Sequence, residues 1–187
     1  LPIQVGSGKM GVIMALNYAN TRRISDNEVN TYDGSGQVSG FVDRANLRNL
    51  NTGGLLNLNY INRHTQISFH NLVNITTDFN SIQRSGVGNY NDALTVQNTA
   101  YILNSNRLYN GILSVKQMIR DSLFTIDASV SYGNVMREVP DYRIASYTRT
   151  PDFPNYRLQL GDFFNSSTGR FASDVNENLW GGNVELS

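Results

Sequence analysis

Hydrophobic and polar residues alternate with a period of two over residues 53–79. This period places successive side chains on opposite faces of a β-strand. The alternation occurs twice, on either side of the short polar link Asn62-Arg63-His64, and therefore predicts an antiparallel hairpin. The face opposite the apolar one is nearly all Asn, Ser, Thr and Gln. The apolar positions are Leu56, Leu58, Tyr60, Ile67, Phe69, Val73 and Ile75.

The same alternation predicts four further strands. They cover 11–21, 94–118, 124–133 and 179–187. Asn71, Ser105 and Arg107 are polar residues at apolar positions, which we interpret as a local bulge or, for Ser105 and Arg107, as positions beyond an apolar band. The intervening polar segments predict three long connections and a second short link. The long connections are 22–50, 80–93 and 137–177, and the short link is 119–122.

Six strands with alternating long and short connections predict an all-β, antiparallel up-and-down meander. In outer-membrane β-barrels, short turns lie on the periplasmic side and long loops lie outside. Tyr18, Tyr60 and Tyr132 lie near the ends of apolar runs, as residues of an aromatic girdle do. The alternative is a soluble β-sandwich, in which each sheet also has one solvated face.

The barrel interpretation predicts on which side of the membrane each turn lies and whether the isolated chain is soluble. It places Arg63-His64 and Arg120-Asp121 on the periplasmic side, and Asp33, Gly88 and Pro154 outside. The 187 residues on their own would be an open sheet with unpaired edges and a broad apolar face, both of which promote association. We therefore expect the isolated segment to be insoluble or aggregated.

Composition narrows the function classes. The length fits one domain, 1–187, and 15 basic residues balance 15 acidic ones, which gives no electrostatic reason to expect nucleic acid as a partner. Cysteine is absent, and the two histidines, His64 and His70, are too few for a histidine-based metal site. No apolar run approaches the roughly 18 residues of a membrane helix. The chain starts with Leu-Pro-Ile, so we expect a mature form or part of a longer protein.

No catalytic or metal-binding motif is evident, and we expect neither an enzyme nor a cofactor. Gly6-Ser7-Gly8-Lys9 lacks the remaining positions of a phosphate-binding loop and predicts a turn. Asp33-Gly34-Ser35-Gly36 lacks the ligand spacing of a calcium loop and also predicts a turn. Asp127 and Glu185 lie on polar faces, but the sequence does not bring them within reach of one substrate. His70 is expected to be an ordinary residue of a polar face.

The segment 137–177 is the best candidate for ligand contact because it combines aromatic residues with arginines. Aromatic rings stack on sugars or pack on peptides, and guanidinium groups bind carboxylates or phosphates. The alternative is that the rings pack the segment on itself. The candidates are Tyr142, Arg143, Tyr147, Arg149, Tyr156 and Arg157, with Phe153, Phe163 and Phe164 as further aromatic residues.

Several stretches resemble the barrel of TonB-dependent outer-membrane receptors, of the type with a carboxypeptidase-regulatory-like domain before the plug. These stretches are barrel strands and loops, which say nothing about the substrate. They are GGLLNLNY (53–60), QISFHNL (66–72), NSIQRSG (80–86), RLYNGILS (107–114), VPDYR (139–143) and FFNSSTGRF (163–171).

The resemblance implies a plugged barrel of about 22 strands. At the strand spacing of this chain such a barrel needs roughly 700 residues, so the chain would be about a quarter of it, without the plug or the segment that contacts TonB. The implied function is import of a glycan, peptide or chelate across the outer membrane. The implied partners are the rest of the barrel and plug, TonB, a surface lipoprotein and outer-membrane lipid. The alternative is a soluble or surface-attached β-sandwich that acts in binding or adhesion.

Overall fold

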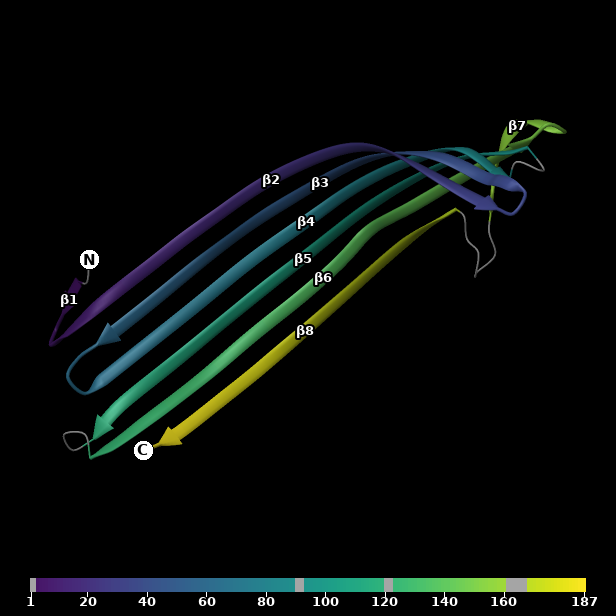
Figure 1. Cartoon of the computed structure of the whole chain (residues 1–187). Coiled ribbons are helices and arrows are strands. Elements are labelled where there is room, and N and C mark those ends of the chain that lie inside the picture. The colour runs from purple at the N-terminus through teal and green to yellow at the C-terminus, as the bar shows by residue number, and fades with distance from the viewer. Residues whose placement is uncertain (1–2, 90–92, 120–122, 161–167) are drawn as a thin grey trace.

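The computed structural model describes residues 3–89, 93–119, 123–160 and 168–187, which form a single antiparallel β-sheet (Figure 1). Among these residues there are six long strands, which run side by side, and two short ones. The strands are β1 (Ile3–Val5), β2 (Gly8–Asp33), β3 (Gly36–Ile61), β4 (Thr65–Asn89), β5 (Leu94–Ile119), β6 (Phe124–Thr150), β7 (Phe153–Leu158) and β8 (Gly169–Leu186).

The topology is a meander, as the sequence predicts. From β1 to β7, each strand pairs antiparallel with the next one in the chain. β8 returns along β6 and pairs with it over residues 126–144, while β7 pairs with the end of β6 beyond residue 146. None of the described residues belongs to a helix that is long and apolar enough to cross a membrane.

The three long connections predicted from the sequence are wrong. Most of 22–50 belongs to β2 and β3, which are joined only by the tight turn at residues 34–35. Likewise, β4 continues to Asn89, and β6 continues to Thr150 and is followed by β7 and β8. The Asp33-Gly34-Ser35-Gly36 turn and the link at residues 62–64 are confirmed, while Arg120 and Asp121 of the second short link lie outside the described residues.

Cross-strand pairing of polar residues explains why the far parts of the strands form without apolar alternation. We call the part of the sheet that ends at the turn 62–64 the near half, and the part that ends at the turn 34–35 the far half. In the far half, Arg84 of β4 and Asp43 of β3 are register partners. They form a bidentate ion pair in which both N–O distances are 2.7 Å. Such opposite-charge pairs stabilise adjacent strands, and a residue-by-residue search for alternation does not detect them.

Pro140 marks an irregularity in β6. Where β6 pairs with β5, the register shifts between Leu103 and Ser105 of β5. Where β6 pairs with β8, it shifts between Val139 and Tyr142 of β6. At both places β6 carries one extra residue. Proline has no N–H to donate to a sheet and is found at bulges for that reason. The bulge expected near Ser105 is therefore confirmed and lies opposite Pro140, whereas no shift occurs at Asn71.

The sheet has two distinct faces in its near half. The register brings Leu58, Phe69, Leu113 and Val130 together on one face, which we call the band face. Their neighbours in sequence, such as Ser129, lie on the opposite face. Apart from glycines, the described residues less than a tenth exposed all lie on this opposite face, as expected for the inner side of a curved sheet. They are Ser39, Ala45, Ser68, Val96 and Ser146.

The chain has almost no core of its own. Ala45 and Val96 are the only buried hydrophobic residues among those described, and none of their side chains is fully buried. The accessible surface is 13017 Å², whereas a compact monomer of this mass would expose about 9,000 Å². A β-sandwich needs a second sheet packed on the first, and the described residues form only one.

Candidate functional site

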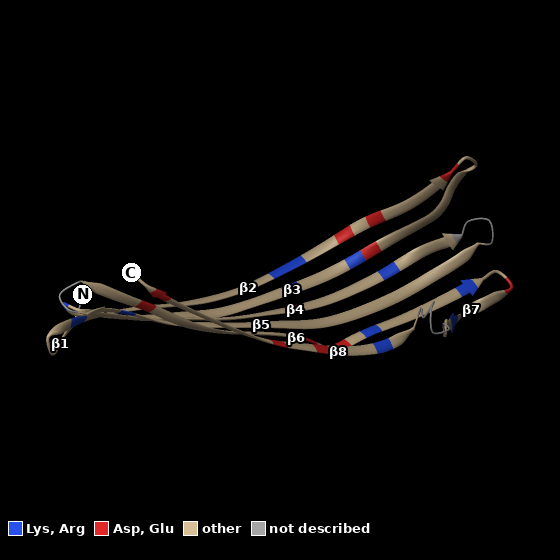
Figure 2. Cartoon of the chain, turned by 90° about the horizontal axis from the view of Figure 1, so that it is seen from below, with Lys and Arg blue, Asp and Glu red and all other residues tan. Residues whose placement is uncertain are grey.

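Charged side chains are concentrated in the far half of the sheet (Figure 2). On the band face of the near half, no described strand carries a charged residue; on β5, for example, this holds from Tyr109 to Ile119. The near-half charges on these strands, such as Lys116, Asp127 and Glu185, lie on the opposite face. The sheet thus carries an uncharged apolar band on one face of one half, and its charged residues lie elsewhere.

A ladder of aromatic rings crosses the band on its far-half side. The ring of Tyr132 lies 5.9 Å from that of Tyr109 and 4.5 Å from that of Trp180, so β5, β6 and β8 are joined by ring contacts. The Tyr132 hydroxyl donates a hydrogen bond of 2.8 Å to Asn178. The two tyrosines of the ladder therefore have an apolar body beside the band and a hydrogen-bonded hydroxyl at the other end, as aromatic residues at a membrane interface do.

Asn71 is part of this arrangement, which explains a polar residue on the band face. Its side-chain oxygen accepts a hydrogen bond of 2.9 Å from the Tyr109 hydroxyl. The Tyr109 ring reaches Asn71 across Gly111, where an added Cβ would lie 2.8 Å from the Tyr109 hydroxyl oxygen. The local bulge that the sequence suggested at Asn71 is therefore wrong, and the polar atom is instead a hydrogen-bond partner of the ladder.

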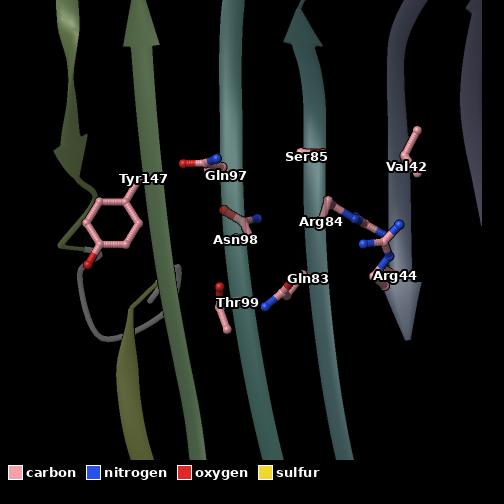
Figure 3. Close-up of a pocket in the computed structure, with 9 residues that line it drawn as sticks. All are labelled: Val42, Arg44, Gln83, Arg84, Ser85, Gln97, Asn98, Thr99 and Tyr147. Atoms are coloured by element: carbon pink, nitrogen blue, oxygen red, sulfur yellow. The ribbon is translucent and has the colours of Figure 1, made fainter. Parts of the chain in front are cut away.

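The far half contains an open hollow of about 500 Å³ that spans β3, β4, β5 and β6 (Figure 3). Nearly all of its lining is polar, and Arg44 within it pairs with Asp26 at 3.1 Å. The lining residues are Val42, Arg44, Gln83, Arg84, Ser85, Gln97, Asn98, Thr99 and Tyr147. Hydroxyls, amides and an aromatic ring on a shallow surface suit a polar ligand such as a sugar better than an apolar one.

Hydrogen-bonded amides cover the opposite face. Asn17 donates to Asn51 at 2.7 Å, and Asn51 donates in turn to Thr76 at 2.9 Å, which links β2, β3 and β4. Further along, Asp43 is only 14% exposed, and its hydrogen bonds from Arg84 hold the pKa of its carboxyl below the usual value. This face therefore carries hydrogen-bonded amides in its near half and a paired charge in its far half.

The structure places the six ligand-contact candidates on strands instead of in a long loop. Tyr142, Arg143, Tyr147 and Arg149 belong to β6, and Tyr156 and Arg157 belong to β7. Register with β5 puts Arg143, Tyr147 and Arg149 on the same face as the band, beyond its end, and Tyr142 on the opposite face. The structure thus does not bring the six together on one surface. Phe163 and Phe164 lie outside the described residues.

Each candidate arginine contacts a neighbour within the chain. Arg149 lies over the ring of Tyr156 with 4.8 Å to the centroid, and Arg157 lies over the ring of Phe153 at 3.7 Å. Arg143 hydrogen-bonds Asp141 through two nitrogens, which lowers the pKa of that carboxyl. These contacts are those expected if the segment packs on itself. A role in ligand contact stays a prediction.

The strand register places two carboxylates side by side, which could not be inferred from the sequence alone. Asp127 of β6 is the partner of Glu185 of β8, and Lys116 of β5 is the partner of Asp127 on its other side. The three side chains form a charged row on the opposite face at the near end. Within the described part of the chain, no group of three acidic, histidine or cysteine residues is placed to hold a metal ion.

Comparison of the sequence with protein-family models and with curated proteins gave no match.

Proposed function

We propose that this chain is part of the wall of a TonB-dependent outer-membrane transporter that imports a nutrient such as a glycan, a peptide or a chelate. The observation that carries the proposal is the uncharged apolar band, which is confined to one face of the near half across six adjacent strands. A soluble sheet of this width would have to cover such a face with a second layer.

Strand length fits the same proposal. A β-strand needs about 9–11 residues to cross a bilayer, and the band on β5 runs from Tyr109 to Ile119. β3 has 26 residues and so extends about 85 Å, which leaves more than half of the strand beyond the bilayer. In this proposal the near half spans the membrane, and the charged far half stands above it on the outside.

The unpaired edges of the sheet are also an argument that this chain is part of a larger barrel. β2 pairs with β1 only at residues 8–10, so its outer edge has no partner over residues 11–33 within the described chain. β8 pairs on one side only, with β6. Long unpaired edges promote aggregation unless another strand covers them, and neighbouring strands of the same barrel would do so.

In this proposal the far half and the outer loops capture the nutrient, and the opposite face lines the lumen. Tyr142, whose ring lies 5.7 Å from that of Phe171, is the one β6 candidate on the lumen side, and Arg157 of β7 pairs with Thr148 on the same side. The plug and the segment that contacts TonB would come from other parts of the protein, and a surface lipoprotein would dock on the outside. The inner-membrane motor would act through TonB to release the nutrient inward.

The proposal is tested with the full-length protein that contains this chain. We expect it to fractionate with the outer membrane and to show the heat-dependent shift in electrophoretic mobility of a folded barrel. Uptake of a panel of labelled oligosaccharides, peptides and chelates is then compared in cells with and without the protein, and with and without TonB. Recovery in the soluble fraction would contradict the membrane part, and uptake independent of TonB would contradict the transport part.

A further inference from the structure

Two arginines lie directly opposite each other on the band face, just beyond the end of the band. Arg22 of β2 and Arg48 of β3 are register partners, and both side chains are exposed. With Phe79 and two asparagines they line a hollow on this face. Like charges directly opposite across a strand pair destabilise the pairing, so this arrangement needs a compensating interaction.

Within the described chain, the compensation comes only from neutral groups. Arg22 donates its Nε–H to Asn46 at 3.1 Å, and Arg48 donates its Nε–H to Asn20 at 3.2 Å. None of the ion pairs among the described residues includes either arginine. The other arginines near the band on this face are paired with acids: Arg107 with Glu138 at 3.2 Å, and Arg44 with Asp26. The pair Arg22–Arg48 is thus a local excess of two positive charges.

The position of the pair relative to the band points to its partner. Arg22 lies four residues along β2 from Tyr18, which is about 13 Å of strand and about 10 Å of height at the usual barrel tilt. The head groups of a bilayer begin directly beyond its hydrocarbon core and extend over about 5–8 Å on each side. Long arginine side chains at this level reach head-group phosphates, and each contributes roughly 1 kcal/mol to binding an anionic surface.

We propose that Arg22 and Arg48 bind the phosphate groups of an anionic glycolipid in the outer leaflet of the membrane that surrounds the barrel. The inference rests on the proposed function, because it requires the band face to contact lipid. Two guanidinium groups present parallel N–H donors that match phosphate oxygens. A phosphate between them would neutralise the like charges, and Asn20 and Asn46 hold the guanidiniums in place by their Nε atoms.

The test uses the full-length protein in nanodiscs of phosphatidylcholine that contain lipid A, either phosphorylated or enzymatically dephosphorylated. Lipid that remains bound after mild detergent extraction is quantified by mass spectrometry. The double variant R22Q/R48Q is compared with R23Q, because Arg23 is the next residue on the same strand, is also exposed and lies on the opposite face. A parallel series adds inorganic pyrophosphate as a competitor, and the heat-dependent mobility shift confirms that each variant is folded.

We expect the unmodified protein and R23Q to retain phosphorylated lipid A in preference to the dephosphorylated form. R22Q/R48Q should lose this preference, with retention lower by on the order of tenfold. Equal retention by both variants, or no preference for phosphorylated lipid, would overturn the inference. Full displacement by pyrophosphate at a comparable concentration would also overturn it and assign the site to free phosphate. Failure of the protein to enter nanodiscs is scored separately by flotation and would refute the proposed function itself.

Discussion

Single residues decide how closely neighbouring strands can approach in this sheet. At Gly111, the missing side chain leaves room for the Tyr109 ring to reach Asn71. At Gly86, the backbone has φ of +156°, and an added Cβ would lie 2.1 Å from the carbonyl oxygen of Gly40. Because that oxygen belongs to the β3 backbone, it cannot move aside as a flexible side chain could. Gly86 therefore fixes the pairing of β3 and β4 at the far end.

Gly86→Ala should destabilise the far end of the β3–β4 pair by about 1–3 kcal/mol, from the steric conflict and the unfavourable backbone conformation. Faster amide hydrogen exchange at Gly40 and Phe41 in the full-length protein would report the loss. Gly34→Ala is the matched control, since nothing lies within 4 Å of a Cβ built at the turn residue Gly34. Similar exchange rates in the two variants would show that the close approach at Gly86 does not control pairing.

At the scale of the strand, apolar alternation predicted the near half of the sheet and the whole of β5, and it failed in the far half of the other long strands. Alternation is imposed by an apolar environment on one side of a strand. The sequence around Val130 obeys it, and the predicted strand there is confirmed. In the far half both faces are polar, and pairs such as Arg84–Asp43 hold the strands together across 41 positions of sequence. A local sequence pattern does not reveal such a pair, so these residues were predicted to form loops. The ligand-contact candidates of β6 were predicted to lie in a loop for the same reason.

Alternation along β6 leads to a prediction about its two faces. Val130 lies on the band face and Ser129 on the opposite face. In the proposed barrel, an arginine at Val130 would face the bilayer and cost about 2–4 kcal/mol near the midplane, whereas one at Ser129 would face water and cost little. Denaturant unfolding of the full-length variants Val130→Arg and Ser129→Arg in lipid vesicles measures both values. Equal costs at the two positions would contradict the assignment of the faces.

For the whole molecule, the ends of the sheet correspond to the two sides of the membrane in our proposal. The turn that contains His64 lies at one end of the long strands, and Pro154 of β7 lies at the other (Figure 1). Single cysteines at these positions in the full-length protein can be labelled on intact cells with a reagent that does not cross membranes. We expect labelling at Pro154→Cys and none at His64→Cys, and the reverse result would invert the topology.

At the scale of the whole molecule, the described residues also lack the hydrophobic core that would stabilise the isolated chain as a folded protein. With Ala45 and Val96 as its only buried hydrophobic residues among those described, it has little burial to offset the entropy of ordering the chain. The isolated 187-residue segment should therefore aggregate, or remain soluble only in detergent. Size-exclusion chromatography and a thermal scan in plain buffer test this expectation. A monodisperse monomer with a cooperative transition would favour the soluble binding or adhesion module instead.

The most direct test of the central claim is whether the band face contacts lipid. Leu113 lies on the band face of β5 and Ser114 on the opposite face. The segment contains no cysteine, so a fluorophore can be attached within it at Leu113→Cys or Ser114→Cys in the full-length protein, which is then reconstituted with lipids brominated on their acyl chains. Our account predicts strong quenching by the brominated chains at position 113 and little at position 114. Equal quenching at both positions, or stronger quenching at 114, would contradict it.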